Sequence, residues 1–145
     1  MVVVIFSTSC QDCVAVLHLM DGIQKQYAAR GLQVVGAAGD EQAKFLLGAF
    51  IARYRPTFPI GYLSEPEIKK LADITPTDQH AMAPILMFID RWGMVREQFF
   101  GNHPIFKSPE KSLKSVTEAM LGVLPVAPPA AKPAAPKSSD PKPQP

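Results

Sequence analysis

The sequence predicts an α/β fold in which helices flank a central mixed sheet. Three observations predict this class. Residues 2–38 read as strand, helix and strand, which is a βαβ unit with parallel strands and a right-handed crossover. Residues 84–100 read as a β-hairpin, and residues 109–121 follow as an amphipathic helix. An N-terminal βαβ unit and a C-terminal ββα unit therefore account for most of the chain.

The first strand and the first helix follow from a change in hydrophobic period. Residues 2–6 (VVVIF) are a continuous apolar run, which is typical of a strand buried on both faces. From Cys10 the apolar residues recur at three- and four-residue steps, which predicts a helix with Ser9 as its N-cap. Arg30 and Gly31 end it with a basic last turn and a C′ glycine. The apolar stripe consists of Cys13, Val16, Leu17, Met20, Ile23 and Tyr27.

The middle of the chain reads as a strand, a helix and a proline-rich stretch. Residues 32–38 (LQVVGAA) are predicted to form a second strand. Residues 40–54 form a helix that Asp40 caps. Residues 55–66 are interrupted by prolines and are predicted to be extended, and residues 67–73 form a short helix.

The hairpin and the last helix complete the predicted domain. Two β-rich runs, residues 84–90 and 94–100, flank a short turn that contains Gly93. The helix over residues 109–121 has lysines on one side and apolar residues on the other, so it should cover a sheet face. Its apolar residues are Leu113, Val116, Met120 and Leu121.

The composition changes sharply at Pro125. The last 21 residues contain eight prolines, five alanines and three lysines. Such a segment cannot bury enough apolar surface to offset the entropy lost on ordering. We therefore predict one domain, residues 1–124, and a disordered tail, residues 125–145.

Charge and hydropathy exclude several classes of function. The chain has 15 basic and 13 acidic residues, and three of the lysines and one aspartate lie in the tail, which leaves 12 of each in the domain. A neutral domain offers no basic surface to nucleic acid or to an anionic membrane. No stretch has the length and apolar character of a membrane-spanning helix. We expect neither a nucleic-acid partner nor a membrane span.

The two cysteines, Cys10 and Cys13, lie at the turn from the first strand into the first helix. Unpaired N–H groups and the helix dipole stabilise a thiolate there. We predict that Cys10 is an exposed nucleophile and that Cys13, one turn inward, resolves a mixed disulfide. Two alternatives stay open: a pair of buried apolar side chains, or zinc ligands. Zinc needs about four ligands, and only His18, His80 and His103 can add to the pair.

Four segments resemble, in the same order, the thioredoxin-like thiol-disulfide oxidoreductases of the TlpA/ResA type. They are VVVIFSTSCQDC, GLQVVGAAGDE, TFPIGY and APILMFIDRWGMVREQFFG, within a similarity over residues 2–122. The resemblance implies a thioredoxin fold and a redox-active Cys10–Cys13 disulfide, with no metal or other cofactor. It implies protein dithiol or disulfide substrates, and a second protein that donates or accepts electrons. It also implies an extracytoplasmic, periplasmic or membrane-anchored location.

The resemblance implies a substrate-positioning role for Pro84 and Ala83. Pro84 aligns with the cis-proline of the family, which lies beside the cysteine pair and exposes backbone for a substrate strand. Apolar residues near the pair are candidates for a docking rim, although each has an equally good explanation as a core residue. These are Phe6, Met82 and Ile85.

The sequence departs from the family around the cysteines. The usual Trp before the first cysteine is Ser9, and the usual Pro before the second is Asp12. The charge of Asp12 opposes thiolate formation, so we expect a less acidic Cys10 than in strongly oxidising relatives. The usual acidic residue three past the second cysteine is Val16. Asp12 and His18 are therefore the candidates for tuning the thiol pKa and for handling the proton.

The family also has a segment before the first strand that this sequence does not contain. Its absence should expose an apolar patch and part of a strand edge, which favours self-association.

Two functions compete with thiol-disulfide exchange. The changes at Ser9, Asp12 and Val16 are compatible with a thioredoxin-like binding module that has no redox activity. A thiol peroxidase is suggested by Ser7, three residues before Cys10, but the proline expected four residues before Ser7 is Val3.

Overall fold

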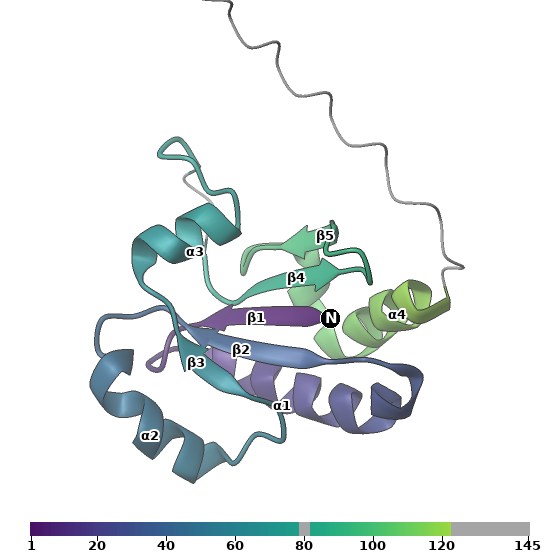
Figure 1. Ribbon diagram of the computed structural model, residues 1–145, viewed down its shortest axis with the longest axis horizontal. Coiled ribbons are helices and arrows are strands. Elements are labelled where there is room, and N and C mark those ends of the chain that lie inside the picture. Colours follow the sequence, from purple (N-terminus) through teal and green to yellow (C-terminus); the bar gives the residue numbers. More distant parts are fainter. Residues whose placement is uncertain (79–81, 123–145) are drawn as a thin grey trace, which may run out of the picture.

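A five-stranded mixed sheet organises the chain (Figure 1). The computed structural model describes residues 1–78 and 82–122. The strand order is β3-β2-β1-β4-β5, with β1 and β2 parallel, β2 and β3 parallel, and β4 antiparallel to both β1 and β5. The strands are β1 (Val2–Phe6), β2 (Val34–Ala38), β3 (Ile60–Tyr62), β4 (Ile85–Ile89) and β5 (Val95–Phe99). The predicted boundary at residue 124, the tail and His80 lie outside the described residues.

Within the part of the chain that the structure describes, four α-helices connect and cover the strands. They are α1 (Gln11–Tyr27), α2 (Ala43–Tyr54), α3 (Glu65–Leu71) and α4 (Pro109–Gly122). The βαβ unit, the hairpin and the last helix predicted from the sequence are confirmed. Gly31 has φ of 90°, the left-handed conformation expected of a C′ glycine.

The first strand lies at the centre of the sheet and is fully buried. Val2 pairs with Val34 in β2 on one side and with Phe88 in β4 on the other. The first strand therefore leaves neither of its edges unpaired, and the sheet ends at β3 and β5.

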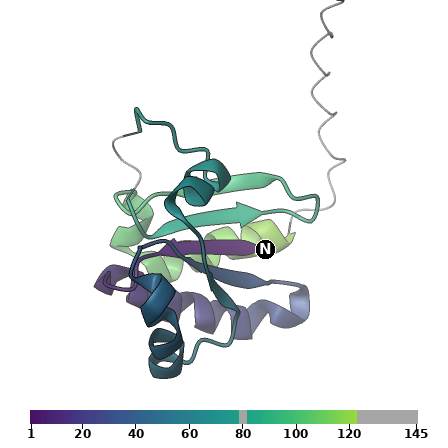
Figure 2. The same ribbon diagram turned by 60° about the vertical axis from the view of Figure 1, so that its left-hand side comes forward.

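Helices cover both faces of the sheet (Figure 2). Each face has its own buried cluster of side chains. The larger cluster lies beneath α1, α2 and α4, and every residue of the apolar stripe predicted for α1 is buried in it. The smaller cluster lies on the opposite face beneath α3 and includes Ile5, Ile68 and Met87. Among the described helices, none is long and apolar enough to cross a membrane.

Two helix starts differ from the sequence-based prediction. Helix α2 begins at Ala43 with Gln42 as N-cap, whereas Asp40 was predicted to cap it. The Asp40 carboxylate is instead engaged by Thr8. Helix α3 begins before residue 67, because Glu67 accepts hydrogen bonds from the Ser64 N–H and hydroxyl and so closes the first turn.

Candidate redox site

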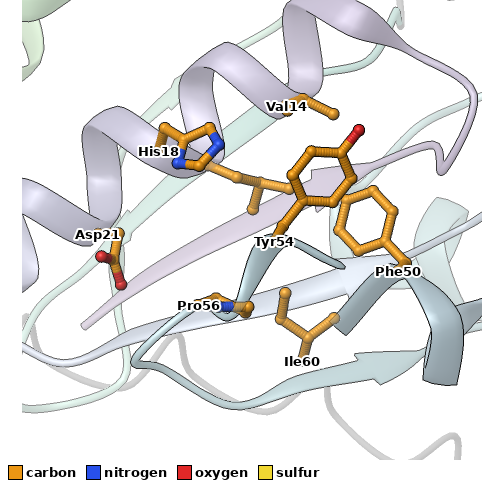
Figure 3. Close-up of a pocket in the computed structure, with 8 residues that line it drawn as sticks. Val14, His18, Asp21, Phe50, Tyr54, Pro56 and Ile60 are labelled. Carbon is orange, nitrogen blue, oxygen red and sulfur yellow. The ribbon is translucent and has the colours of Figure 1, made fainter. Parts of the chain in front are cut away.

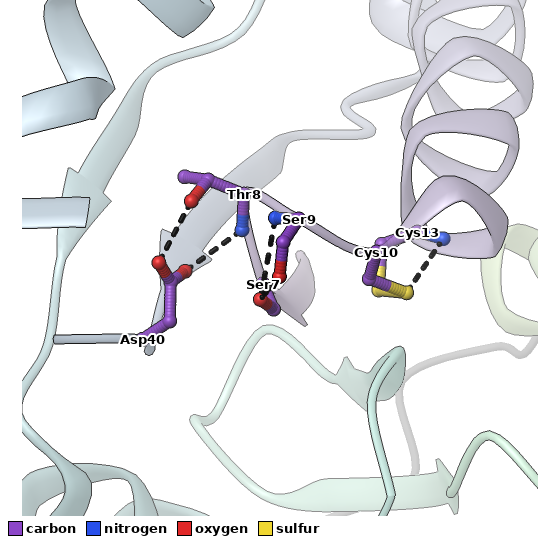
Figure 4. The surroundings of a disulfide bond; sticks show 6 residues. All are labelled: Ser7, Thr8, Ser9, Cys10, Cys13 and Asp40. Atoms are coloured by element: carbon purple, nitrogen blue, oxygen red, sulfur yellow. Dashed lines mark hydrogen bonds between the residues drawn. A yellow bond between two sulfur atoms is a disulfide. The ribbon is translucent and has the colours of Figure 1, made fainter. Parts of the chain in front are cut away.

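The two cysteines form a disulfide where β1 leads into α1 (Figure 4). Their Cα atoms are 5.2 Å apart, within the usual range for a disulfide. Cys10 is the N-cap of α1, and its Sγ accepts a hydrogen bond from the Cys13 N–H at 3.1 Å. The prediction that Ser9 caps the helix is wrong, because the Ser9 N–H and hydroxyl pair with the Ser7 hydroxyl. A sulfur atom therefore occupies the position at which α1 offers N–H groups.

The two sulfurs differ in accessibility. Cys10 is half-buried, whereas Cys13 is completely buried in the larger core cluster. Of the two residues, only Cys10 is therefore in contact with solvent. The sequence predicted an exposed Cys10 and a Cys13 one turn inward, and Cys10 is in fact only half exposed. The roles of nucleophile and resolving thiol stay predictions.

A carboxylate from the neighbouring strand connection holds the loop before Cys10. Strands β1 and β2 run parallel and end together, with Phe6 opposite Ala38. Asp40 follows β2, and its two oxygens accept from the Thr8 N–H and the Thr8 hydroxyl, each at 2.7 Å (Figure 4). Partial burial acts to raise the pKa of Asp40, but the hydrogen bonds to its carboxylate, of which those from Thr8 lower it most, together leave the pKa below its ordinary value of 3.8.

The segment before β4 reaches the same end of the sheet. Ile85 pairs with Ile5, which places Pro84 alongside Phe6 at the end of β1. The Ala83–Pro84 peptide bond is cis, as the resemblance implies. Pro84 is buried, while Ala83 and Met82 are exposed. Phe6 and Ile85 are core residues, with exposures of 1% and 4%, so of the three rim candidates only Met82 is exposed.

Gly101 packs closely against the backbone of this segment and hydrogen-bonds to it. Its N–H donates to the Met82 carbonyl at 2.7 Å. A Cβ atom at this position would lie 2.5 Å from the Ala83 carbonyl oxygen and 2.8 Å from the Ala83 carbonyl carbon. Only glycine therefore allows the backbone of the segment to lie where it does.

The two candidates for tuning the thiol pKa lie on exposed faces of α1. Asp12 is in the first turn, and His18 packs edge-on against the Tyr54 ring, with ring centroids 5.9 Å apart. His18 lines a small pocket between α1 and α2 (Figure 3). It follows Cys13 by five residues, which is about 140° around the helix. Neither candidate hydrogen-bonds to a cysteine within the described residues, and their tuning roles stay predictions.

Within the described residues, neither a metal-binding cluster nor the larger of the two pockets lies beside the disulfide. No three His, Cys, Asp or Glu side chains gather to hold a metal within residues 1–78 and 82–122. A larger hollow of about 790 Å³ lies beside Val2, at the start of β1. The disulfide follows the other end of that strand.

Sequence reasoning missed Thr8, Asp40 and Gly101. For Asp40 a signal was present, because residues that follow two adjacent parallel strands meet at one edge of the sheet. For Gly101 none was present, since a close approach between two loops depends on tertiary packing.

No protein-family model matches the chain, and no curated protein sequence matches it. Several solved structures do. A protein from Chlorobium tepidum described as a thiol:disulfide interchange protein DsbE is 23% identical with a TM-score of 0.69, over 83% of this chain and 79% of that one. A thiol-disulfide isomerase from Corynebacterium glutamicum is 21% identical with a TM-score of 0.63, over 85% of this chain and 80% of that one. StoA from Bacillus subtilis is 19% identical with a TM-score of 0.61, over 80% of each chain. The chain therefore has a thioredoxin-like fold, and the fold class predicted from the sequence is confirmed.

Proposed function

We propose that this protein is a thiol-disulfide oxidoreductase that exchanges the Cys10–Cys13 disulfide with disulfides or dithiols of other proteins. The observation that carries the proposal is the state and position of the pair. It is disulfide-bonded at the N-terminus of α1, with one sulfur accessible and the other buried. Such sites favour a reactive thiolate at the accessible position. The named activities of the structural neighbours point the same way.

The exchange runs in two steps. In the reducing direction, the Cys10 thiolate attacks one sulfur of a substrate disulfide, and the other substrate sulfur leaves as a thiolate. Cys13 then gives up its proton and attacks Cys10 Sγ, which forms the Cys10–Cys13 bond and releases the first substrate sulfur. Both substrate thiolates take up protons, so the substrate gains two electrons and two protons. The reverse sequence oxidises a substrate dithiol, and a second protein restores the starting state.

The fold contributes to each step. In the reduced protein, the Cys13 N–H that now donates to Cys10 Sγ is available to a thiolate. Because Cys13 is completely buried, the sulfur within its reach is that of Cys10. This arrangement favours resolution of the mixed disulfide over attack by Cys13 on a second substrate.

Substrate recognition uses the segment before β4. Met82 and Ala83 are exposed, and the strand register places Pro84 at the end of β1 from which the disulfide loop departs. We infer that this segment offers its backbone to an extended stretch of substrate. From the resemblance we place the reaction outside the cytoplasm, where disulfides persist.

Trapping of the mixed disulfide tests this function. We expect Cys13→Ser to accumulate a disulfide between Cys10 and a chain of insulin, detected by intact-mass spectrometry, because the resolving thiol is missing. Cys10→Ser should form none, since its remaining thiol is buried. Wild type should accelerate the reduction of insulin by dithiothreitol. If Cys13→Ser traps nothing and wild type does not accelerate the reaction, the domain is a binding module.

A further inference from the structure

The loop from β1 to α1, residues 7–10, has few contacts that fix it. Three of its hydrogen-bond contacts are internal. The Cys10 N–H donates to the Ser7 carbonyl at 3.2 Å, the Ser9 N–H donates to the Ser7 hydroxyl at 3.4 Å, and the Ser7 and Ser9 hydroxyls lie 3.1 Å apart. The hydrogen bonds that tie it to a distant part of the described chain are the two between Thr8 and Asp40. Thr8 is only two residues from the accessible cysteine.

Asp40 is a firm anchor for this loop. The Gly39 N–H before it donates to the Phe6 carbonyl at 2.9 Å, which links the ends of β1 and β2. The Asp40 carbonyl accepts from the Ala43 N–H at 2.9 Å, where α2 begins. The backbone at Asp40 is therefore held on both sides. Its two oxygens divide between the N–H and the hydroxyl of one residue, which restricts both the position and the orientation of Thr8.

We propose that Asp40 is a positioning residue for Cys10, and that its two hydrogen bonds with Thr8 keep the sulfur of Cys10 against the first turn of α1 when the disulfide is open. This inference rests on the proposed function. In the oxidised protein the covalent bond holds the two sulfurs together. In the reduced protein two hydrogen bonds still hold Cys10 to α1, from the Cys13 N–H to its sulfur and from the Val14 N–H to its carbonyl. Neither of them restrains residues 7–9, so the bonds between Thr8 and Asp40 have to hold that part of the loop.

Loss of the anchor has two consequences. The two thiols spend less time within bonding reach, so their effective concentration falls and the disulfide forms less readily. The Cys10 thiolate also loses the donors at the helix N-terminus, so the thiol becomes less acidic.

A purely electrostatic role of Asp40 predicts the opposite sign. A carboxylate near a thiol opposes thiolate formation, so removal of its charge alone would make Cys10 more acidic. The direction of the change in Cys10 acidity therefore separates positioning from charge.

Three variants separate the two roles. Asp40→Ala removes both hydrogen bonds and the charge. Asp40→Asn removes the charge but keeps an acceptor for the Thr8 N–H and an amide that can pair with the Thr8 hydroxyl. Thr8→Val keeps the charge and the side-chain shape but removes the hydroxyl. Each variant is equilibrated in glutathione buffers for the disulfide-formation constant, and is alkylated over a range of pH for the acidity of Cys10.

We expect Asp40→Ala to lower the disulfide-formation constant about tenfold, since hydrogen bonds to a charged group are stronger than neutral ones. Its Cys10 alkylation should shift to higher pH. Thr8→Val should show a smaller change of the same sign, and Asp40→Asn should stay within about threefold of wild type.

Asp21 supplies a matched control. One of its oxygens accepts from the Thr57 N–H at 2.7 Å and from the Thr57 hydroxyl at 2.5 Å, the same two donor groups that Thr8 offers to Asp40. Its other oxygen pairs with Lys25 Nζ at 2.6 Å. It lies eight residues beyond Cys13 on α1, about 12 Å along the helix. Asp21→Ala should therefore lower the melting temperature without changing the glutathione equilibrium.

Three outcomes would overturn the proposal. In one, Asp40→Ala and Asp40→Asn both shift alkylation to lower pH, which shows a role of charge alone. In the second, Asp40→Ala and Thr8→Val match wild type. In the third, Asp21→Ala reproduces the effect of Asp40→Ala, which shows general destabilisation.

A failure of the proposed function looks different. Wild type would then form its disulfide in glutathione but exchange with no protein, and the comparison of variants would still stand. If wild type formed no disulfide at all, hydrogen exchange of the Thr8 amide would test the anchor. The Thr8 amide should lose its protection from exchange in Asp40→Ala and keep it in Asp40→Asn. Equal protection in the two variants would overturn the proposal that Asp40 positions the loop.

Discussion

Asp12 lies between the two cysteines, exposed in the first turn of α1. Its carboxylate has two opposing effects. It stabilises the helix through the dipole, and it opposes a thiolate at Cys10. The first effect appears in the free energy of unfolding and the second in the reactivity of Cys10, so the two can be measured separately.

We predict that Asp12→Asn makes the Cys10 thiol more acidic and costs about 0.3–1 kcal/mol of stability. Asp12→Pro should also make it more acidic, since proline is tolerated in the first turn of a helix. The rate of alkylation against pH gives the thiol pKa. Glu110→Gln, in the first turn of α4, is the control and should leave Cys10 unchanged. An unchanged or raised thiol pKa in both Asp12 variants would show that Asp12 does not act on Cys10.

Because the pKa of Asp40 is lowered in the folded protein, we predict how its contribution to the free energy of unfolding changes with pH. A carboxyl group whose pKa is lower in the folded than in the unfolded state stabilises the fold above its unfolded pKa, and that contribution is lost as pH falls through the folded value. The difference in unfolding free energy between wild type and Asp40→Ala should therefore be largest near neutral pH and shrink below the ordinary value of 3.8. Urea unfolding from pH 7 to pH 3 measures it. A difference that is constant with pH would mean that the charged form of Asp40 does not stabilise the fold.

Single-residue roles were predictable only where the local sequence decides them. Cys10 and Cys13 were identified because a strand, a turn and a helix start follow one another within a few residues. Ser9 and Asp40 were both assigned as helix caps and neither is one. Both are good cap residues, but each found a different hydrogen-bond partner, and for Asp40 that partner is 32 residues away.

At the scale of secondary-structure elements, the position of residues 82–84, before β4, depends on Gly101, which follows β5. Gly101 bonds to Met82 and leaves no room for a Cβ atom beside the Ala83 carbonyl. Backbone atoms cannot rotate away as a side chain can, so the segment itself would have to move.

We predict that Gly101→Ala destabilises the fold by about 1–3 kcal/mol, the usual cost of overpacking, and slows exchange with insulin. Gly48→Ala in α2 is the matched control. A Cβ at Gly48 meets nothing within 4 Å, and alanine should stabilise the helix by about 0.5–1 kcal/mol. Thermal unfolding and the insulin assay measure both variants. Equal stability of Gly101→Ala and wild type would show that the contact is easily relieved.

The elements themselves were predictable where one period dominates. Helix α1 and strands β1 and β4 follow directly from apolar runs and stripes. The region from 40 to 73 was less predictable, because α2 is apolar on its exposed side as well, with Phe45 84% exposed. A helix without a polar face gives no periodic signal of where it begins.

At the scale of the whole molecule, the parallel and antiparallel pairs of the sheet bring the disulfide loop, Asp40 and Pro84 to one end. The βαβ unit and the hairpin could be predicted from local patterns. The pairing of β1 with β4 could not, because it joins residues 80 to 86 positions apart. The βαβ crossover accounts for the contact of Thr8 with Asp40, and the long-range pairing of β1 with β4 accounts for the position of Pro84.

We predict that deletion of residues 125–145 leaves the melting temperature and insulin reduction unchanged. The segment contains a single large aliphatic residue, Val126, so it has little with which to pack. Differential scanning calorimetry of both forms gives the comparison. A large fall in melting temperature on deletion would show that the tail belongs to the folded domain.

The central claim is that Cys10 and Cys13 form a reversible, redox-active pair. Its most direct test is equilibration of the wild-type protein in glutathione buffers of graded ratio, followed by acid quenching, alkylation and mass spectrometry. The account predicts a single two-electron transition between a dithiol and an intramolecular Cys10–Cys13 disulfide, the same from both directions. A protein whose two thiols stay reduced and unmodified at every ratio, while the fold remains intact, would contradict it.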